Sequence, residues 1–345
     1  MSRRPRDYAV SALQWGVMLT AVWYVARSVS WRETLGLLAG VEPWILLAVV
    51  GVTLLQFCAQ FGQWWTLVNA VERTPLSDIV RLDLVIKFIN HVIPSKMSGH
   101  SIAPLVLRHY TDLAWSDAVS VSGLKTGLYA TLYGLFALAG LAVFFTRLSG
   151  GLTLVILLST GLYVTIGVLV LLAGRRLELA GALFSWLEGA VTAVPRVGGR
   201  LAALVGKLPS FTEDSAARFR ELSSRPGVVG PYALAWAGTL VVFPGIRVAL
   251  VLTGLGGRFE PLVLLPLLLV MAYSVTILPL TPGGVGVAEA SATFVFVSLG
   301  VSEELAVAVV LVDRVFGVYL PALVGAVPMG DLDLSTLLSS EQEPE

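Results

Sequence analysis

The chain has 345 residues, of which 56% are hydrophobic and only 13% are charged, and its formal net charge at pH 7 is zero. The charged share is about half of what soluble domains carry, so the composition excludes an ordinary soluble protein and indicates an all-α integral membrane protein, a polytopic helical bundle. Cys58 is the only cysteine, which excludes a disulfide framework and a cysteine-based metal site, and we expect neither a metal nor another cofactor.

The first apolar run, residues 8–26, follows three arginines near the N-terminus. It is long for the apolar core of a signal peptide, and Tyr24-Val25-Ala26 is a poor small-residue cleavage site. We therefore predict a first span that is retained. A second span is expected at residues 43–65, because Trp44 and the pair Trp64-Trp65 would lie at the two membrane interfaces.

Residues 78–110 are too rich in charged side chains for an ordinary span. They nevertheless contain two apolar runs, 82–93 and 102–107, on either side of a polar stretch at 94–99. Each run is too short to cross about 30 Å of hydrocarbon as a helix. We predict a re-entrant hairpin that enters and leaves the membrane on one side.

Two full spans are predicted next, at residues 119–145 and 152–173, and the longest polar segment follows at residues 174–231. Apolar residues in that segment recur at helical spacing, and many arginines lie between them. This pattern is typical of amphipathic helices on a membrane surface, with the arginines directed at anionic head groups.

The last part of the chain contains spans at residues 232–255 and 303–327, with a broken apolar segment at 262–299 between them and an acidic tail at 328–345. The broken segment is predicted to form a second re-entrant hairpin. Because residues 258–280 could cross about 30 Å at about 1.5 Å per residue, two complete tilted spans are the alternative.

The interruption of this segment combines helix-breaking residues with an acid. Its prolines and glycines are Pro279, Pro282, Gly283, Gly284 and Gly286. The prolines lack a backbone donor, and the glycines permit backbone angles that are closed to other residues. Such an open backbone persists in lipid only where it is buried in protein or lines a wet cavity. Since Glu289 follows directly, the pattern is typical of a transporter's substrate site.

The distribution of lysine and arginine predicts a cytoplasmic N-terminus and a cytoplasmic segment at residues 174–231. Counting spans from there, the first hairpin enters from the cytoplasm, the second enters from outside, and both termini are cytoplasmic. The halves at about 43–145 and 232–327 are then opposite in membrane sense, which is the inverted repeat of many secondary transporters. We treat residues 1–345 as a single transmembrane domain.

Three stretches carry a resemblance to a known family. They are Leu278-Pro279 with Pro282-Gly283-Gly284-Val285-Gly286-Val287-Ala288-Glu289-Ala290, Asp313-Arg314-Val315-Phe316-Gly317 with Leu320-Pro321-Ala322-Leu323-Val324-Gly325, and Ile93-Pro94-Ser95-Lys96-Met97-Ser98-Gly99. The first resembles the signature of the flippase-like family, which is also named after the transmembrane region of lysylphosphatidylglycerol synthase. The other two resemble the closing helix and the first conserved loop of that family.

The chain departs from this family at two points. Where the family usually has Gly-Gly in the first loop, this chain has Ser98-Gly99, and where it often has an acid–arginine pair, this chain has Leu124-Lys125. The resemblance covers nearly the whole chain and implies a multi-pass lipid translocase. It makes aminoacylated phospholipids and polyprenyl-linked sugars the candidate lipids, without choosing between them.

Several charged side chains fall within or near predicted spans, where a charge at the membrane centre costs at least about 2.5 kcal/mol and needs a partner or a cavity. One hypothesis is mutual neutralisation, in which Glu289 pairs with Arg314, and Asp313 pairs with Lys125 or Arg247. The other is that the surplus of bases, together with helix N-termini, cradles a phosphate head group. Both can hold, because a resting ion pair can open when a ligand arrives. The candidate substrate-binding residues are Lys96, Ser98, Gly99, Lys125, Arg247, Gly283, Gly284, Gly286, Glu289, Asp313 and Arg314.

Two further sets of polar residues are given structural roles. Gln56, Gln60 and Gln63 lie on roughly one face of their span, and we expect them to form hydrogen bonds with other helices. Tyr129 and Tyr133 also share a face, and packing is their expected role.

The leading hypothesis is a translocase of the cell membrane for an anionic phosphate-bearing lipid or a polyprenyl-linked lipid. No G-x-x-x-x-G-K-[ST] motif is present, so the energy would come from the lipid gradient or from ions, with Glu289 or Asp313 carrying a proton. The alternatives are an intramembrane enzyme acting on head groups, and a membrane scaffold or small-solute carrier. We expect no enzyme, because neither G-x-S-x-G nor H-E-x-x-H occurs, and no nucleic-acid partner.

Overall fold

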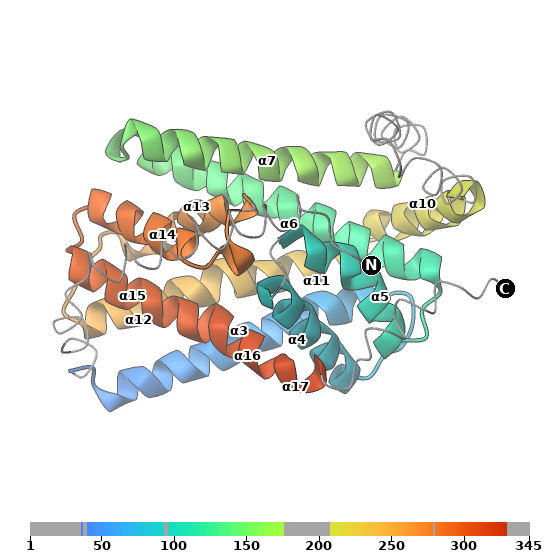
Figure 1. Ribbon diagram of the computed structural model, residues 1–345, viewed down its shortest axis with the longest axis horizontal. Helices are drawn as coiled ribbons and strands as arrows, with labels where there is room; N and C mark the ends of the chain where they lie inside the picture. Colours follow the sequence, from blue (N-terminus) through green and yellow to red (C-terminus); the bar gives the residue numbers. More distant parts are fainter. Residues whose placement is uncertain (1–35, 37–39, 93–95, 176–207, 279, 330–345) are drawn as a thin grey trace, which may run out of the picture.

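The computed structural model describes residue 36 and residues 40–92, 96–175, 208–278 and 280–329. The predicted first span at 8–26, the tip of the first hairpin at 93–95, much of the polar segment and the acidic tail from 330 onward lie outside the described residues. Within the described part, the chain is helical and contains no strand (Figure 1). The predicted class, an all-α polytopic membrane protein, is confirmed.

Five helical stretches of the described chain are long and apolar enough to cross a membrane. They are α3 (Pro43–Val68), α6 with η1 (Trp115–Arg147), α7 (Gly150–Arg175), Pro226–Gly254 and Glu303–Pro328. At about 1.5 Å per residue, each is longer than the roughly 30 Å of a bilayer's hydrocarbon. Every predicted span after the first corresponds to one of them. Leucines such as Leu47 on α3 and Leu158 on α7 are 73% and 62% exposed on their outer faces, as lipid contact requires.

Two of these spans contain a π-helical turn that is followed by a proline. The first consists of α11 (Pro226–Ala237), η2 (Gly238–Val242) and α12 (Phe243–Gly254), and the second of α15 (Glu303–Arg314), η6 (Val315–Tyr319), α16 (Leu320–Val324) and α17 (Ala326–Met329). Pro244 and Pro321 lack the N–H that an α-helix needs, and their rings crowd the carbonyl four residues earlier. A widened turn relieves that crowding. Both π turns therefore have a local cause in the sequence, and η6 begins directly after Arg314.

Four shorter helices form two pairs. The first pair is α4 (Leu76–Val92) with α5 (Lys96–Tyr110), and the second is α13 (Leu265–Tyr273), flanked by η3 (Leu262–Leu264) and η4 (Ser274–Ile277), with α14 (Val287–Ser298). The two helices of each pair pack against each other. The 12 residues of α14 extend about 18 Å, which is well short of the hydrocarbon thickness. The re-entrant hairpins and the inverted repeat stay predictions.

The two pairs meet inside the bundle. In Figure 1, α13 and α14 lie toward one end of the long axis, and α4 and α5 toward the other. The break between α13 and α14 contains η5 (Pro282–Gly284), which contacts both α4 and α5. On its other side, α4 packs against α16, where a methyl group on Gly325 would lie 2.2 Å from the Leu84 carbonyl oxygen. The first pair is thus wedged between the break and the last span.

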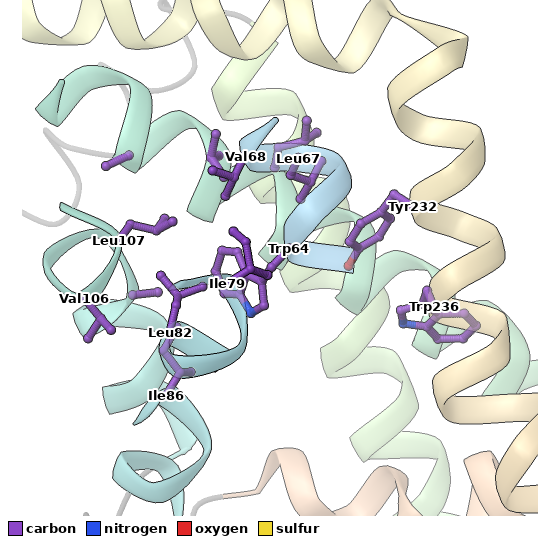
Figure 2. Close-up of a cluster of buried hydrophobic side chains, with 14 of the residues drawn as sticks. Trp64, Leu67, Val68, Ile79, Leu82, Ile86, Val106, Leu107, Tyr232 and Trp236 are labelled. Atoms are coloured by element: carbon purple, nitrogen blue, oxygen red, sulfur yellow. The ribbon is translucent and has the colours of Figure 1, made fainter. Parts of the chain in front are cut away.

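A buried apolar cluster holds the first pair against the long helices (Figure 2). Its labelled members are Trp64, Leu67 and Val68 of α3, Ile79, Leu82 and Ile86 of α4, Val106 and Leu107 of α5, and Tyr232 and Trp236 of α11. A second cluster joins α12 to α15, with Val251, Leu268, Phe296 and Val309 among its members. Close packing of this kind, rather than removal of apolar surface from water, stabilises helix contacts inside a membrane.

The α6–α7 pair packs closely through small residues. A methyl group on Gly134 would lie 2.9 Å from the backbone nitrogen of Val164, so the backbones of the two helices approach closely because Gly134 has no side chain. Beside this contact, the ring of Tyr133 stacks on the rings of Tyr129 and Tyr163, with centroids 5.6 Å and 4.4 Å away. The predicted packing role of Tyr129 and Tyr133 is confirmed.

The helix α10 (Leu208–Ser224) packs against α6 and α7. Nε of Arg218 donates to Asp117 at 2.7 Å, and its Nη1 donates to Glu221 at 2.7 Å. The hydrogen bond to Asp117 raises the pKa of Arg218 above its ordinary value. Arg225 also bonds to Glu221. Arg218 and Arg225 thus bind acids of the protein while remaining partly exposed, and the expectation that the arginines of residues 174–231 face lipid head groups stays a prediction.

Candidate functional site

The predicted pair Glu289–Arg314 is present at the restart of the broken helix. Nε of Arg314 donates to Oε1 of Glu289 at 2.6 Å, and the two residues are only 5% and 6% exposed. The guanidinium carbon lies 5.5 Å from the ring centroid of Tyr273 and 5.4 Å from that of Tyr319. An arginine held between two aromatic rings and a carboxylate is fixed in direction as well as in charge.

The glycines of the break shape the backbone around this carboxylate. Gly283, Gly284 and Gly286 have φ angles of 61°, 73° and 82°, which other residues rarely adopt. The amide of Gly286 donates to Oε2 of Glu289 at 2.6 Å. Glu289 lies in the first turn of α14, where the helix dipole favours a negative charge. The break therefore aims a backbone donor at the acid.

The second acid, Asp313, pairs with Arg247. Nε of Arg247 donates to Oδ1 of Asp313 at 3.0 Å, and Nη2 donates to the same oxygen. Of the two partners considered for Asp313 from the sequence, the structure selects Arg247 rather than Lys125. Arg247 also donates through Nη1 to Oε1 of Gln56 on α3. The pair thus joins three spans, and Arg247 is only 1% exposed.

Tyr273 connects the two ion pairs. Its hydroxyl donates to Oδ2 of Asp313 at 2.9 Å, while its ring faces Arg314. The hydroxyl of Tyr319, one π turn beyond Arg314, donates to Oε1 of Glu289. Together these residues form one hydrogen-bonded network, which we call the charged centre: Gln56, Arg247, Tyr273, Glu289, Asp313, Arg314 and Tyr319. It draws on α3, α12, α13, α14, α15 and η6.

The glutamines of α3 tie this network to its surroundings, as predicted. Nε2 of Gln56 donates to the backbone oxygen of Thr239, and Nε2 of Gln63 donates to its hydroxyl, both at 2.9 Å. Thr239 belongs to the π turn η2. Nε2 of Gln60 donates instead to Asp83 on α4. The three glutamines therefore link α3 to two different elements.

A second group of charges surrounds Asp83, between α3, α4 and α6. Nζ of Lys87 donates to Oε1 of Gln60, and the ammonium of Lys125 lies 4.4 Å from the ring centroid of Trp64. Asp83 attracts both ammonium groups. Among the described residues, this group contains two bases, Lys87 and Lys125, and one acid, Asp83. Lys96, Ser98 and Gly99 lie in the first turn of α5, and their side chains lie outside the described residues.

Three buried polar atoms near the break have no hydrogen-bond partner among the described residues. They are Nη2 of Arg314, Oγ1 of Thr281 and Oγ of Ser274. A buried donor without an acceptor costs roughly 1–3 kcal/mol, and more when it is charged. An oxygen-rich group bound beside Arg314 would remove part of that cost. No cluster of three or more potential metal ligands occurs in the described ranges.

The family described as "Lysylphosphatidylglycerol synthase TM region" matches residues 9–325. The chain belongs to this family. A UPF0104 membrane protein of Pyrococcus horikoshii, PH1989, is similar to it: 29% of the aligned residues are identical over 127 positions, which cover 36% of this chain and 35% of that protein. The match therefore spans about a third of that relative. No solved structure matches the chain.

Membership in the lysylphosphatidylglycerol synthase TM region family supports a multi-pass membrane protein with a lipid-related function. The predicted site residues left out Tyr273, Tyr319, Asp83 and Lys87, which belong to the polar groups described above. Tyr319 follows Arg314 by five residues, and two residues at that spacing lie on the same helix face only where the helix has a π turn. Asp83 could have been noticed, since a lone acid between apolar residues on a predicted intramembrane helix needs a partner.

Proposed function

We propose that this member of the lysylphosphatidylglycerol synthase TM region family is a lipid translocase of the cell membrane. It moves an anionic phosphate-bearing lipid, or a polyprenyl-linked lipid, between leaflets without changing it chemically. The head group passes the charged centre, and the hydrocarbon remains in the bilayer.

One observation carries this proposal: the charged centre is buried beside a broken helix, and one of its guanidinium nitrogens has no partner in the part of the chain that the structure describes. Buried ionisable residues in membrane proteins mark substrate or ion pathways. If the buried charges only neutralised each other, two ion pairs with all their donors occupied would be enough. Nη2 of Arg314, however, has no acceptor among the described residues, and phosphate oxygens are the acceptors that a planar guanidinium binds best.

The charges near Asp83 support an anionic head group over a cationic one. Among the described residues, two bases, Lys87 and Lys125, lie around one acid, Asp83, and this balance would favour an anion next to the break. A phosphate would be drawn toward these bases and would reach Arg314 by exchange with Glu289. Lys96, Ser98 and Gly99 are proposed to face the same path from the first turn of α5.

The two pairs of short helices support movement rather than static binding. Since η5 contacts both α4 and α5, a rocking of one pair against the other would open the charged centre first to one leaflet and then to the other. Inverted repeats of broken helices commonly work in this way. This step rests on the predicted opposite membrane sense of the two pairs.

Glu289 or Asp313 is the proposed proton carrier if ions supply the energy. Protonation of Glu289 would remove the negative charge that holds Nε of Arg314. The guanidinium, which stays charged, would then be available to the head group. Proton binding at Glu289 would therefore favour phosphate binding at Arg314.

The test is reconstitution of the purified protein in phosphatidylcholine vesicles that contain fluorescent phosphatidylglycerol. Loss of signal after addition of a membrane-impermeant quencher reports which leaflet the label occupies. We expect Arg314→Lys to remain folded but to lose at least about tenfold in rate, because the charge stays while the planar fork is lost. Arg218→Lys is the matched control, because its hydrogen bonds go to Asp117 of α6 and Glu221 of α10, outside the charged centre. Wild-type movement by Arg314→Lys would show that the arginine is only a counter-ion.

The same vesicles separate the other functions. Chemical analysis that finds an altered head group would indicate an intramembrane enzyme instead. A lipid that is neither moved nor altered would indicate a membrane scaffold or a small-solute carrier.

A further inference from the structure

A groove of about 480 Å³ lies between the beginning of α7 and one face of α14. From α7 and the turn before it, Ser149, Gly151, Leu152 and Val155 line the groove, and Val275 and Leu280 line it from the neighbourhood of the break. The helix α7 packs against η4 but leaves this face of α14 partly uncovered. In Figure 1, α7 and α14 run beside each other at the end of the molecule that also holds α13.

The groove uses a face of α14 that points away from the charged centre. Its lining residues on this helix are Val287, Ala290, Ser291, Phe294 and Ser298, which recur at helical spacing. Glu289 is not among them, since it turns toward Arg314 on α15. The helix that carries the acid therefore offers its second face to a separate ligand.

The surface of the groove suits hydrocarbon. The hydroxyl of Ser291 donates to the backbone oxygen of Ala272 at 2.8 Å, and that of Ser298 donates to Phe294 at 2.7 Å. Because both hydroxyls already donate to backbone oxygens, they need no hydrogen bond from water in the groove. The other lining side chains of α14 are apolar, and so are Leu152, Val155 and Leu280.

The length of the groove matches one leaflet. The 12 residues of α14 extend about 18 Å, and half of the hydrocarbon core is about 15 Å thick. One end of the groove lies at the break, near Leu280 and Val287, and the other lies at Ser149 and Ser298, where α7 begins and α14 ends. The apolar lining and the extent of the groove along α14 fit a single flexible hydrocarbon chain.

We propose that this groove binds one hydrocarbon chain of the lipid that the protein moves, with the head group at the Ser149–Ser298 end and the chain terminus at the break. The inference rests on the proposed function, because it takes the bound lipid to be the cargo. It adds that the cargo is held by a single chain within one leaflet. That chain would lie against α14, whose opposite face carries Glu289, the ion-pair partner of Arg314.

The direct test uses phosphatidylglycerol with a diazirine near the end of one acyl chain, in phosphatidylcholine vesicles that hold the full-length protein. After illumination, mass spectrometry of the digested protein locates the adducts. We expect enrichment on residues 149–155 and 287–298 relative to the outward-facing Leu158, which is 62% exposed. Uniform labelling of all lipid-facing residues would overturn the proposal.

Two glycines of α7 provide a matched pair of variants. A Cβ atom at Gly151 or at Gly161 would meet nothing within 4 Å, so both positions have room for a side chain to begin, and both changes to leucine are expected to fold. Only Gly151 lines the groove. We expect Gly151→Leu to lower adduct formation about tenfold, the loss expected when two methylene groups are displaced from apolar contact, and Gly161→Leu to leave it unchanged. Equal labelling of the two variants would contradict the assignment.

Labelling and movement are measured separately, so the two proposals fail separately. Adducts that disappear in Gly151→Leu, in vesicles whose wild-type protein moves no lipid, would support the groove and refute the translocase. Movement of lipid without groove adducts would refute the groove alone.

Discussion

Glu289 is the side chain on which the contacts at the break converge. Its carboxylate accepts from the Gly286 amide, from Nε of Arg314 and from the hydroxyl of Tyr319. Each donor comes from a different element, so the acid acts as a joint between α14, α15 and η6. Removing its charge would affect all three at once.

The first prediction at this scale concerns Glu289→Gln. The change leaves Arg314 buried without a counter-charge, which costs about 3–5 kcal/mol. We expect a lower thermal unfolding temperature in detergent and less folded protein on expression. Glu221→Gln is the control, because Glu221 is half-exposed and its ion pairs with Arg218 and Arg225 are worth less than about 1 kcal/mol. Equal stability of the two variants would contradict the counter-charge role.

A second residue-scale prediction concerns Gly286→Ala. Gly286 has a φ of 82°, and forcing an alanine into the left-handed region costs roughly 1–2 kcal/mol. We expect destabilisation of that size by thermal unfolding, with weaker lipid movement because the amide donor to Glu289 shifts. Gly161→Ala lies in a helix with open space around it, and alanine there should be neutral or stabilising by up to about 1 kcal/mol. Full stability in Gly286→Ala would mean that the break does not need this geometry.

At the scale of elements, the π turns bring distant residues into contact. Gly317 lies in η6, and a methyl group there would lie 2.5 Å from Nη2 of Arg247. That guanidinium cannot easily retreat, since Asp313 and Gln56 hold it. The close approach of η6 to α12 therefore depends on a glycine at this position.

We accordingly predict that Gly317→Ala disturbs the Arg247–Asp313 pair. Overpacking of this kind destabilises by about 1–3 kcal/mol, which thermal unfolding in detergent would detect. Gly51→Ala on α3 is the control, because a methyl group there meets nothing within 4 Å. Should Gly317→Ala match the control, the contact between the π turn and Arg247 is looser than described.

At the scale of the whole molecule, the distribution of lysine and arginine predicts the orientation in the membrane, and thiol labelling tests it. In a Cys58→Ala background, Ser149→Cys and Ser224→Cys each offer one exposed thiol, at opposite ends of α7 and its neighbours. We expect an impermeant maleimide to label Ser149→Cys from outside intact cells and Ser224→Cys only after the cells are opened. The reverse pattern would invert the predicted topology, and labelling of both from outside would refute the number of crossings.

The sequence by itself determined the spans, the helix break and the charged residues of the charged centre, which are Arg247, Glu289, Asp313 and Arg314. Apolar runs of sufficient length can satisfy their backbone only as helices in lipid, so α3 begins at Pro43 as predicted. The boundaries moved where helices continue past the apolar run: the span predicted to begin at residue 232 begins at Pro226, since backbone hydrogen bonds propagate into polar flanks. The pairing of Glu289 with Arg314 was also predictable, because an intramembrane acid needs a base.

Only the tertiary structure decided how the charges are distributed among partners. Asp313 had two candidate bases, and the choice of Arg247 over Lys125 depends on the rotation of α12, which the π turn η2 alters. Tyr273 and Tyr319 joined the charged centre because a helix break and a π turn aim their hydroxyls at the acids. The sequence shows which charged side chains lie within membrane spans and therefore need a partner. The packing of six helical elements determines which partner each of them has.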